Sequence, residues 1–486
     1  MGDSRSFLMS DSDSETRSHS SLASTSTVGK PPRRVLIIGA GIAGLASALS
    51  ISKELTPFVP DVQITVFERH DVLSTSGGAI NLTPVAQRHL DYLGVLAELD
   101  KMGSYGGADV DAIELFSNGT GRSLGSIDFT DSLGNGYGGY KGRRVMRIIL
   151  SVAMMAVLKR LKNVDVVFGK KLVTGTEAED HATVHFEDGT TAEGDLVVGC
   201  DGVQSATRTL WVDPNAVAQY TGLSFVQTTM CATELTTKPH FRGTAMNISR
   251  HGSLLASYCD RDKEQLFLAA IVEFDERALD VHRESREQDW RTRHGMRQRL
   301  AETMHHRFGH SAISCVRAMI SQASDWILYP VYQVQPGRRW HNDRVLLLGD
   351  AAHAVRAPIP WVWLGAQLTY LQMPPRDESA AYALDDAILL ARVLARLRNH
   401  PPSEIFQAYE ETRRRTVNSA YEVSNRMWNQ HRDMGTVHGW WKERKLPRSI
   451  RKQKDGREAA WEFDARDIDI PLSSDQLFSA YSGDSS

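Results

Sequence analysis

The stretch RRVLIIGAGIAGLASALSISKEL, residues 33–55, decides the fold of this chain. Its short apolar run VLII is typical of a buried parallel strand. Gly39, Gly41 and Gly44 follow in the spacing G-x-G-x-x-G and lead into an apolar helix pattern. The first glycine permits a tight turn, the second lets backbone N–H groups approach a pyrophosphate, and the third lets the helix pack against the strand. The stretch therefore predicts a strand–turn–helix unit that binds a dinucleotide.

A second apolar run, Val62–Phe67, ends in the acidic residue Glu68. An acid roughly 20 residues beyond the last glycine is what the ribose hydroxyls of a dinucleotide require. The run GNGYGG, residues 134–139, matches the same glycine spacing, but no strand pattern precedes it and no helix pattern follows it. We interpret it as a loop, so the sequence predicts one dinucleotide site.

Composition narrows the class of protein. The chain has 486 residues and a net charge of −3 with well-mixed signs, which gives no indication of a nucleic-acid partner. Its four cysteines are far apart and lack metal-ligand spacing, which favours a reducing, cytoplasmic location and no metal site. No apolar run reaches the ~18 residues of an integral membrane segment. Residues 1–32 are rich in serine and threonine and are expected to form a disordered tail.

Three further stretches carry a family resemblance. They are VFERHDVLSTSGGAINL at residues 66–82, GDLVVGCDGVQSATR at 194–208, and RVLLLGDAAHA at 344–354. Together with the glycine motif they resemble the single-component FAD-dependent aromatic hydroxylases, the para-hydroxybenzoate and salicylate hydroxylase family. The resemblance covers about residues 33–400. It implies an α/β fold in which a Rossmann-type FAD-binding domain is interleaved with an antiparallel β-sheet substrate domain, followed by C-terminal helices.

The resemblance also implies a division of the chain. The discontinuous FAD-binding domain is expected at residues 33–105, 140–215 and 335–400. The substrate-binding sheet is expected at residues 106–139 and 216–334, and a C-terminal helical segment and tail at 401–486.

Cofactor contacts follow from the resemblance, position by position. Glu68 would bind the adenosine ribose with Arg69 beside it, and Asp201 and Gly202 form the Asp-Gly pair associated with FAD and with the nicotinamide pyrophosphate. Asp350 would hold the ribityl chain. The remaining expected contacts are Ala79, with Gly78, near the flavin ring, Arg147 at a helix start, and Ala381 at the start of a later helix.

The implied function is hydroxylation of a small aromatic or polyketide-like substrate. NAD(P)H would reduce FAD, and O2 would give a C4a-hydroperoxyflavin that transfers oxygen to the substrate. No catalytic side chain is assigned, because the cofactor carries the chemistry. The alternatives are a flavin epoxidase or reductase of the same fold, and a catalytically impaired product of an unspliced transcript.

The last alternative arises from residues 355–372, VRAPIPWVWLGAQLTYLQ, which have neither helical nor strand periodicity. Removing these 18 residues restores the family spacing between GDAAHA and the helix pattern that begins near Ser379. The segment corresponds to a multiple of three nucleotides, and its codons can encode splice signals. We therefore interpret it as a translated intron; the alternative is a genuine family-specific loop, and apolar loops above ~15 residues are uncommon.

Two other regions have weaker signals. Strand-like stretches such as GSLLASYCD and LFLAAIVEFD belong to the expected substrate sheet. Arg250, His251 and Tyr258 are candidate substrate contacts there, although we favour ordinary sheet residues for each of them. The basic and aromatic residues 440–457 are expected to form a solvated helix.

Overall fold

A computed structural model of the chain describes residues 29–74, 78–274, 290–354, 379–428, 432–452 and 460–470. The expected tail at residues 1–32 lies almost entirely outside these ranges, and the proposed insert, 355–372, lies wholly outside them. No helix in these ranges is long and apolar enough to cross a membrane.

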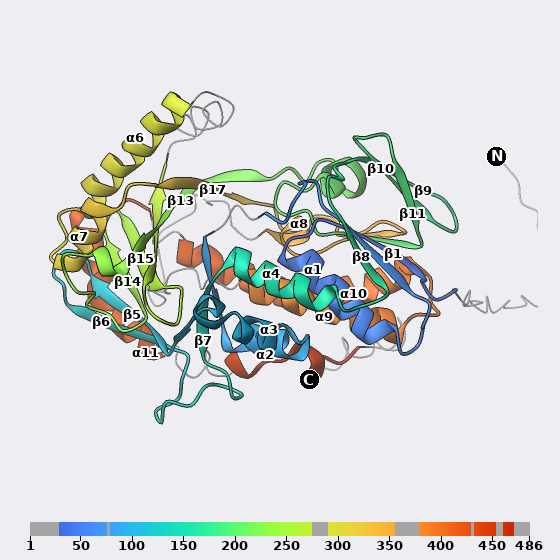
Figure 1. Ribbon diagram of the computed structural model, residues 1–486, viewed down its shortest axis with the longest axis horizontal. Coiled ribbons are helices and arrows are strands. Elements are labelled where there is room, and N and C mark those ends of the chain that lie inside the picture. The colour runs from blue at the N-terminus through green and yellow to red at the C-terminus, as the bar shows by residue number, and fades with distance from the viewer. Residues whose placement is uncertain are drawn as a thin grey trace, which may run out of the picture.

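A parallel sheet forms the centre of one end of the molecule (Figure 1). Its order is β18-β12-β1-β2-β8, so strands far apart in the sequence become neighbours. The five strands are β1 (Arg34–Ile38), β2 (Gln63–Phe67), β8 (Val164–Val167), β12 (Leu196–Gly199) and β18 (Val345–Leu347). The apolar residues of the four strands β18, β12, β1 and β2 are buried, as expected for a parallel sheet covered on both faces, whereas Val166 and Val167 of the edge strand β8 are half-buried.

The glycine motif forms the predicted turn between β1 and helix α1 (Ile42–Leu55). Gly39 has a φ of +103°, which a residue with a side chain rarely adopts. A Cβ at Gly44 would lie 1.9 Å from the carbonyl oxygen of Gly39, so only glycine lets α1 approach the strand this closely. The prediction of a strand–turn–helix unit is confirmed.

Helices cover this sheet. Helices α1, α4 (Arg147–Leu158) and α9 (Ser379–Arg396) lie side by side beneath the parallel strands in Figure 1. The buried face of α9 includes Leu384, Ile388 and Leu389, none of which is exposed. Helix α10 (Pro402–Trp428) packs on α9.

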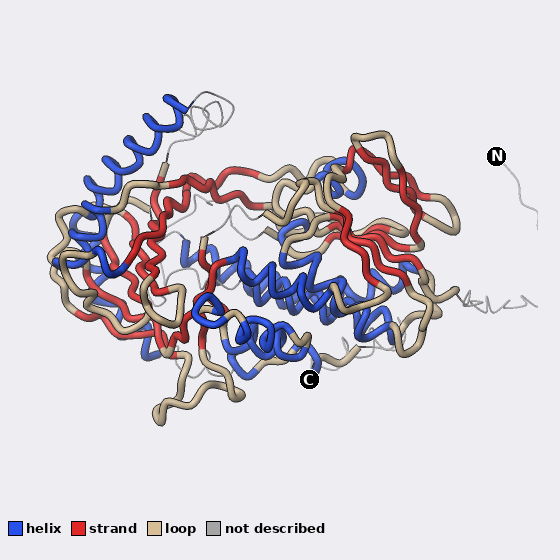
Figure 2. The backbone as a smooth tube through the Cα atoms, in the orientation of Figure 1, coloured by secondary structure: helices blue, strands red, loops and turns tan. Residues whose placement is uncertain are grey.

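A seven-stranded sheet forms the other end of the molecule, and its long strands β13 and β17 extend toward the parallel sheet (Figure 2). Its order is β17-β13-β16-β15-β14-β5-β6. The strands are β5 (Ala112–Ser117), β6 (Ser123–Asp128), β13 (Gln219–Cys231), β14 (Thr244–Ser249), β15 (Gly252–Tyr258), β16 (Gln265–Glu273) and β17 (Ile327–Gln333). The predicted substrate sheet is present, but it is not wholly antiparallel, because β14 and β5 pair in parallel.

The large sheet has two different faces. Leu254, Ala256 and Leu268 belong to an outer face that packs on helices α6 (Trp290–Phe308) and α7 (Ser314–Gln322). Leu255 and Phe267, together with other residues of the same cluster, belong to an inner face on the opposite side. Alternate residues of a strand point to opposite faces, which explains this division.

Two three-stranded antiparallel sheets complete the described fold. One, β3-β7-β4, comprises β3 (Ala79–Leu82), β4 (Ala108–Val110) and β7 (Gly142–Met146), and it lies against the inner face of the large sheet. The other comprises β9 (Leu172–Glu177), β10 (Ala182–Phe186) and β11 (Thr191–Gly194). β4 lies inside the expected substrate segment 106–139, yet it pairs with β7 rather than with β5 and β6.

The helix expected at residues 440–457 is present up to Lys452, but it is only partly solvated; residues 453–457 lie outside the described ranges. In α11 (Thr436–Lys452), Leu446 and Ile450 are buried against the large sheet. An apolar side chain at these two positions, one helical turn apart, gives α11 a buried stripe that the abundant basic residues obscure in the sequence. Residues 460–470, here called the strap, then lie across α2 (Pro84–Tyr92).

Replacing Arg88 with alanine is expected to destabilise the protein through the strap. The buried Arg88 guanidinium donates hydrogen bonds to the carbonyl oxygens of Trp461, Glu462 and Phe463 at 2.9–3.1 Å. Only the bond to Trp461 is fully buried; its unpaired carbonyl would cost roughly 1–3 kcal/mol, and the two partly buried bonds would each add roughly 0.5 kcal/mol, so we expect a loss of about 2–4 kcal/mol in the free energy of unfolding. Chemical denaturation would measure it. The control is Lys171→Ala, which removes an exposed ion pair and should change the free energy of unfolding little. Equal losses in Arg88→Ala and Lys171→Ala would contradict the stabilising role of the strap.

Candidate functional site

The carboxyl ends of four adjacent parallel strands gather the polar residues of the site. In sheet order, β18 leads to Asp350, β12 to Asp201, β1 to Gly39 and β2 to Glu68. The turns lie close to one another. A Cβ at Gly39 would lie 2.6 Å from the carbonyl oxygen of Cys200, and a Cβ at Gly349 would lie 3.1 Å from the Cβ of Ala43. Ligands of open α/β sheets bind at this edge.

Gly41 occupies the open part of this edge. It is the N-cap of α1, with φ −74° and ψ −177°, and a Cβ added there would meet no atom within 4 Å. Glycine is therefore not required at this position by the packing of the chain itself. An open glycine at a helix N-terminus is what close approach of a pyrophosphate requires.

Glu68 is tied to the glycine loop. The backbone N–H of Ala40 donates to one carboxylate oxygen at 2.9 Å, and that of His70 donates to the other at 3.1 Å. The side chain is 13% exposed, which leaves part of the carboxylate open beside the loop. Glu68 thus braces the loop and still presents an acceptor to a ribose. Arg69, by contrast, is exposed at the surface.

Asp201 holds its own turn in place. Its carboxylate accepts hydrogen bonds from the Ser205 hydroxyl at 2.5 Å and from the Thr207 backbone N–H and hydroxyl at 2.9 and 3.1 Å. The neighbouring Gly202 has a φ of +79°, and a Cβ there would meet nothing within 4 Å. The side chain of Asp201 therefore braces the turn, while Gly202 leaves the turn open to a ligand.

The carboxylate of Asp350, unlike that of Asp201, is not used to hold its own turn. Asp350 is exposed, and its carboxylate makes no hydrogen bond within the described ranges of the chain. It is the first residue of the short helix α8 (Asp350–His353), which starts from Gly349 with a φ of +62°. The carboxylate is therefore available to a ligand at the edge of the sheet.

Arg147 and Ala79 approach the site from the small sheet. Arg147 begins α4, its backbone N–H donates to the carbonyl oxygen of Gly78 at 3.0 Å, and its buried Nε has no hydrogen-bond partner among the described residues. Ala79 is buried and pairs with Met146. A Cβ at Gly78 would lie 2.2 Å from the Phe267 ring, so Gly78 allows the small sheet to reach the inner face of the large sheet.

Other predicted residues are placed differently. Ala381 is buried in the first turn of α9 and offers no polar group. Tyr258 packs in the outer-face cluster with Phe241, away from the inner face. Arg250 and His251 lie at the β14–β15 turn, where the carbonyl oxygen of His251 accepts from Arg307. The substrate role that the sequence suggested for these last three residues receives no support from their positions.

Sequence reasoning missed the residues that support α8. Asp386, unexposed on α9, contacts both ends of α8, and the buried Arg208 donates to the carbonyl oxygen of Ala351 at 2.8 Å. Burial alone would raise the pKa of Asp386, but the charges and hydrogen bonds of His353 and Arg413 outweigh it and lower the pKa to about 2. The signal in the sequence is the acidic pair in ALDDAILLA, which falls on an otherwise buried helix.

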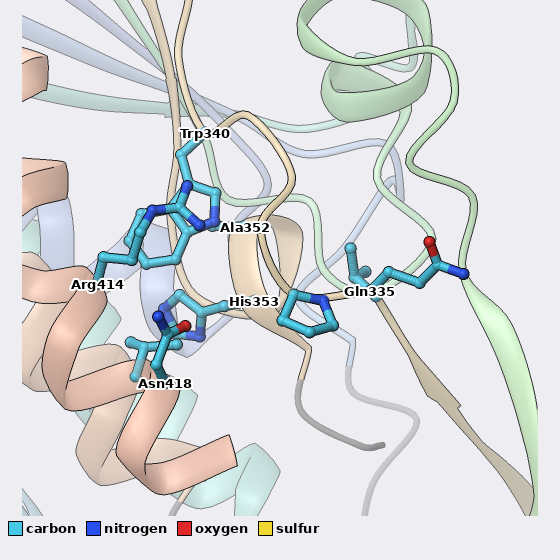
Figure 3. A pocket seen from close by; sticks show the side chains of 10 residues that line it. Gln335, Trp340, Ala352, His353, Arg414 and Asn418 are labelled. Atoms are coloured by element: carbon cyan, nitrogen blue, oxygen red, sulfur yellow. The ribbon is translucent and has the colours of Figure 1, made fainter. Parts of the chain in front are cut away.

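A separate pocket is lined by His353 together with Trp340 and Arg414 (Figure 3). Trp340 forms part of its wall, with the Arg414 guanidinium 4.4 Å from its ring centroid and the His353 ring 5.2 Å away. None of the predicted site residues lines it. Within the described ranges, no group of three or more histidine, cysteine, aspartate or glutamate side chains could hold a metal ion.

Among the described residues the Asp350 carboxylate and the Arg147 Nε have no hydrogen-bond partner, and with the open glycine loop they fit a long anionic dinucleotide with a polar chain. Fold and site together define a dinucleotide-binding protein of the open α/β class. A scan of family models matches residues 33–360 to the FAD binding domain family. A 6-hydroxynicotinate 3-monooxygenase of Bordetella bronchiseptica is 23% identical over 400 residues, which are 82% of this chain and 91% of that protein.

Solved structures give the same fold. The chain matches Klebsiella pneumoniae HpxO complexed with FAD and uric acid with a TM-score of 0.67 and 19% identity, covering 88% of this chain and 96% of that one. It matches a salicylate hydroxylase substrate complex with a TM-score of 0.66 and 20% identity, covering 91% and 99%. The chain belongs to the FAD binding domain family and is a flavoprotein monooxygenase of the para-hydroxybenzoate and salicylate hydroxylase type. Its cofactor is FAD.

Replacing Glu68 with alanine is expected to weaken FAD binding about tenfold to a hundredfold. The change removes a charged acceptor for ribose hydroxyls, worth roughly 1.5–3 kcal/mol per hydrogen bond, and also frees the Ala40 N–H of the glycine loop. Glu68→Gln keeps an acceptor for that N–H and should have a smaller effect. Fluorescence titration of the apoprotein with FAD would measure both. Equal affinities in all three proteins would show that the ribose binds elsewhere.

Proposed function

We propose that this flavoprotein hydroxylates a small, uncharged aromatic or polyketide-like substrate, using NAD(P)H and O2. The observation that carries the proposal is the chemistry of the inner face next to β3. From the register of β14, β15 and β16, its residues are Thr244, Met246, Ile248, Ser253, Leu255, Ser257, Phe267, Ala269 and Ile271. None of these side chains is charged, so the face suits an apolar ring with few polar groups.

We propose that FAD lies along the strand ends described above. The glycine loop and Glu68 would hold the ADP half, with Arg69 and Gly202 at its rim and Asp201 bracing the turn. Asp350 and Arg147 would hold the chain between pyrophosphate and flavin, with Ala79 and Ala381 beside the ring. The bound flavin would supply the redox chemistry, accepting a hydride from NAD(P)H and activating O2 by the route that the sequence resemblance implies.

The protein's own contribution is position and exclusion of water. The small sheet meets the inner face through the close contact at Gly78 and Phe267, and Ala79, Leu255 and Ala269 are buried there. A substrate ring held between such surfaces is shielded from solvent, which protects a reactive oxygen donor from side reactions. The relatives' names support the aromatic class of the substrate, since they include a 6-hydroxynicotinate 3-monooxygenase and a 3-hydroxybenzoate 6-hydroxylase. Both named substrates carry a carboxylate, so the uncharged class proposed here rests on the inner face alone.

The proposed function divides the chain into three portions and places it in the cytoplasm. The FAD-binding portion would comprise residues 33–105, 140–215 and 335–400, the substrate portion 106–139 and 216–334, and the C-terminal portion 401–486. The family match ends at residue 360, inside the segment 355–372 that we interpret as a translated intron. All four cysteines are free thiols, which favours a reducing compartment such as the cytoplasm.

The proposed reaction is tested by NADH and NADPH oxidation and by oxygen uptake with a panel of neutral and carboxylated phenols. We expect neutral phenols to stimulate reduced-nicotinamide oxidation, and one oxygen atom from ¹⁸O₂ to enter the product. Stimulation by carboxylated substrates alone would contradict the uncharged substrate class. Reduction without oxygen transfer to any substrate would favour a reductase.

A further inference from the structure

The buried Asp386 clamps both ends of α8. Its Oδ2 atom accepts the Gly349 backbone N–H at 3.0 Å and lies 2.8 Å from Nε2 of His353. Gly349 precedes the helix and His353 is its last residue. One carboxylate oxygen therefore spans the short helix that begins with Asp350.

The clamp is itself held in place. Asp386 Oδ1 accepts a hydrogen bond from Nε of Arg413 at 2.5 Å, and Arg413 is buried on α10. Asp386 has no exposed surface and therefore cannot contact a ligand in solution directly. Any effect of Asp386 on a ligand has to pass through the turn that it holds.

We infer that Asp386 is a positioning residue that presents the Asp350 carboxylate to the flavin half of FAD. Gly349 adopts a φ of +62° and a ψ of −141°, a backbone conformation open essentially to glycine, and its N–H bond to Asp386 helps to fix it. Arg208 holds the middle of α8 through the carbonyl oxygen of Ala351, and it makes no hydrogen bond to Gly349 or His353 among the described residues. Without Asp386, the turn is free to rotate Asp350 away from the sheet edge. This inference rests on the proposed role of Asp350 in FAD binding.

The adjacent residue Asp385 provides a matched control. It is also a buried aspartate on α9, and it also pairs with Arg413, with 3.4 Å between Nη2 and Oδ2. Its other partner is His89 on α2, at 3.1 Å, and it has no contact with α8 among the described residues. Asp385→Ala and Asp386→Ala therefore each remove one buried charge beside Arg413, but only the second releases α8.

The experiment measures the dissociation constants of FAD and of ADP for the two variants. We expect Asp386→Ala to weaken FAD about tenfold, as for one lost charged hydrogen bond. ADP, which the glycine loop and Glu68 would hold, should bind within about twofold of the unmodified protein, because no contact to the ADP half has changed. Asp385→Ala should leave both affinities within about twofold, even where it lowers the melting temperature. Equal weakening of FAD and ADP by Asp386→Ala would mean general structural damage and would overturn the inference.

Two further variants keep the inference testable if Asp386→Ala does not fold. His353→Phe removes one end of the clamp and keeps the Asp386–Arg413 pair; it should weaken FAD about threefold and leave ADP unchanged. Asp350→Asn should make the effect of His353→Phe on FAD disappear, because both changes act through the same carboxylate. Additive effects would contradict positioning through Asp350. If neither the unmodified protein nor the chain lacking residues 355–372 binds FAD, the proposed function is refuted instead, whatever the variants do.

Discussion

Replacing Gly41 with serine is expected to weaken FAD binding roughly a hundredfold while leaving the apoprotein as stable as before. The space beside Gly41 is empty, since a Cβ there would meet no atom within 4 Å, and its φ of −74° suits any residue. Serine is also a good N-cap, so α1 loses no capping interaction. The new side chain would instead occupy the space where the pyrophosphate approaches the loop. FAD titration and thermal denaturation of the apoprotein would measure the two effects separately.

Substitutions at two other glycines serve as controls for Gly41→Ser. Gly119→Ser, in the β5–β6 turn, also adds a side chain to open space, and it should change neither property. Gly44→Ala places a Cβ 1.9 Å from the carbonyl oxygen of Gly39 and should destabilise the apoprotein itself. A Gly41→Ser protein that binds FAD normally would show that the pyrophosphate does not pass this loop.

Deleting residues 355–372 is expected to raise FAD occupancy from a small fraction to about one per chain, with a parallel rise in substrate-stimulated NAD(P)H oxidation. The shortened chain can connect the described flanks. His353 contacts Asp386, which lies seven residues, about 10 Å, along α9 from Ser379. The remaining residues 373–378 can span roughly 20 Å when extended. The deletion also removes an apolar segment that contains Trp361 and Trp363, so soluble yield should rise.

The deletion also tests the origin of the segment. Sequencing of transcripts across codons 350–378 would show whether the corresponding nucleotides are removed from the mature message. If the full chain is already saturated with FAD and active, and the shortened chain unfolds, the segment is genuine protein and the translated-intron interpretation has to be abandoned.

The parallel sheet and its glycine loop are predictable from sequence because each depends on local rules. VLII followed by Gly39, Gly41 and Gly44 specifies strand, turn and helix within one short stretch, and Asp350 follows its strand in the same way. Parallel strands place their carboxyl ends at one edge, so the gathering of Glu68 and Asp350 near the loop follows from fold class alone.

Contacts between distant segments were not predictable. The clamp of Asp386 on Gly349 and His353 joins residues more than 30 positions apart, and no periodicity encodes which helix face meets which turn. The packing of residues 460–470 against Arg88 depends on partners more than 370 positions away. Tyr258 was a plausible substrate contact in sequence, but strand register decides which face it occupies, and the register places it on the outer face.

The flavin content of the purified protein tests most directly that this chain is an FAD-dependent monooxygenase. The full chain and the chain lacking residues 355–372 would each be purified, incubated with excess FAD, desalted and heated to release any bound flavin. We predict that the shortened chain is yellow and releases about one non-covalent FAD per chain, identified by its mass and absorbance, since the site offers one glycine loop. Two colourless proteins that retain no FAD after this treatment would contradict the account.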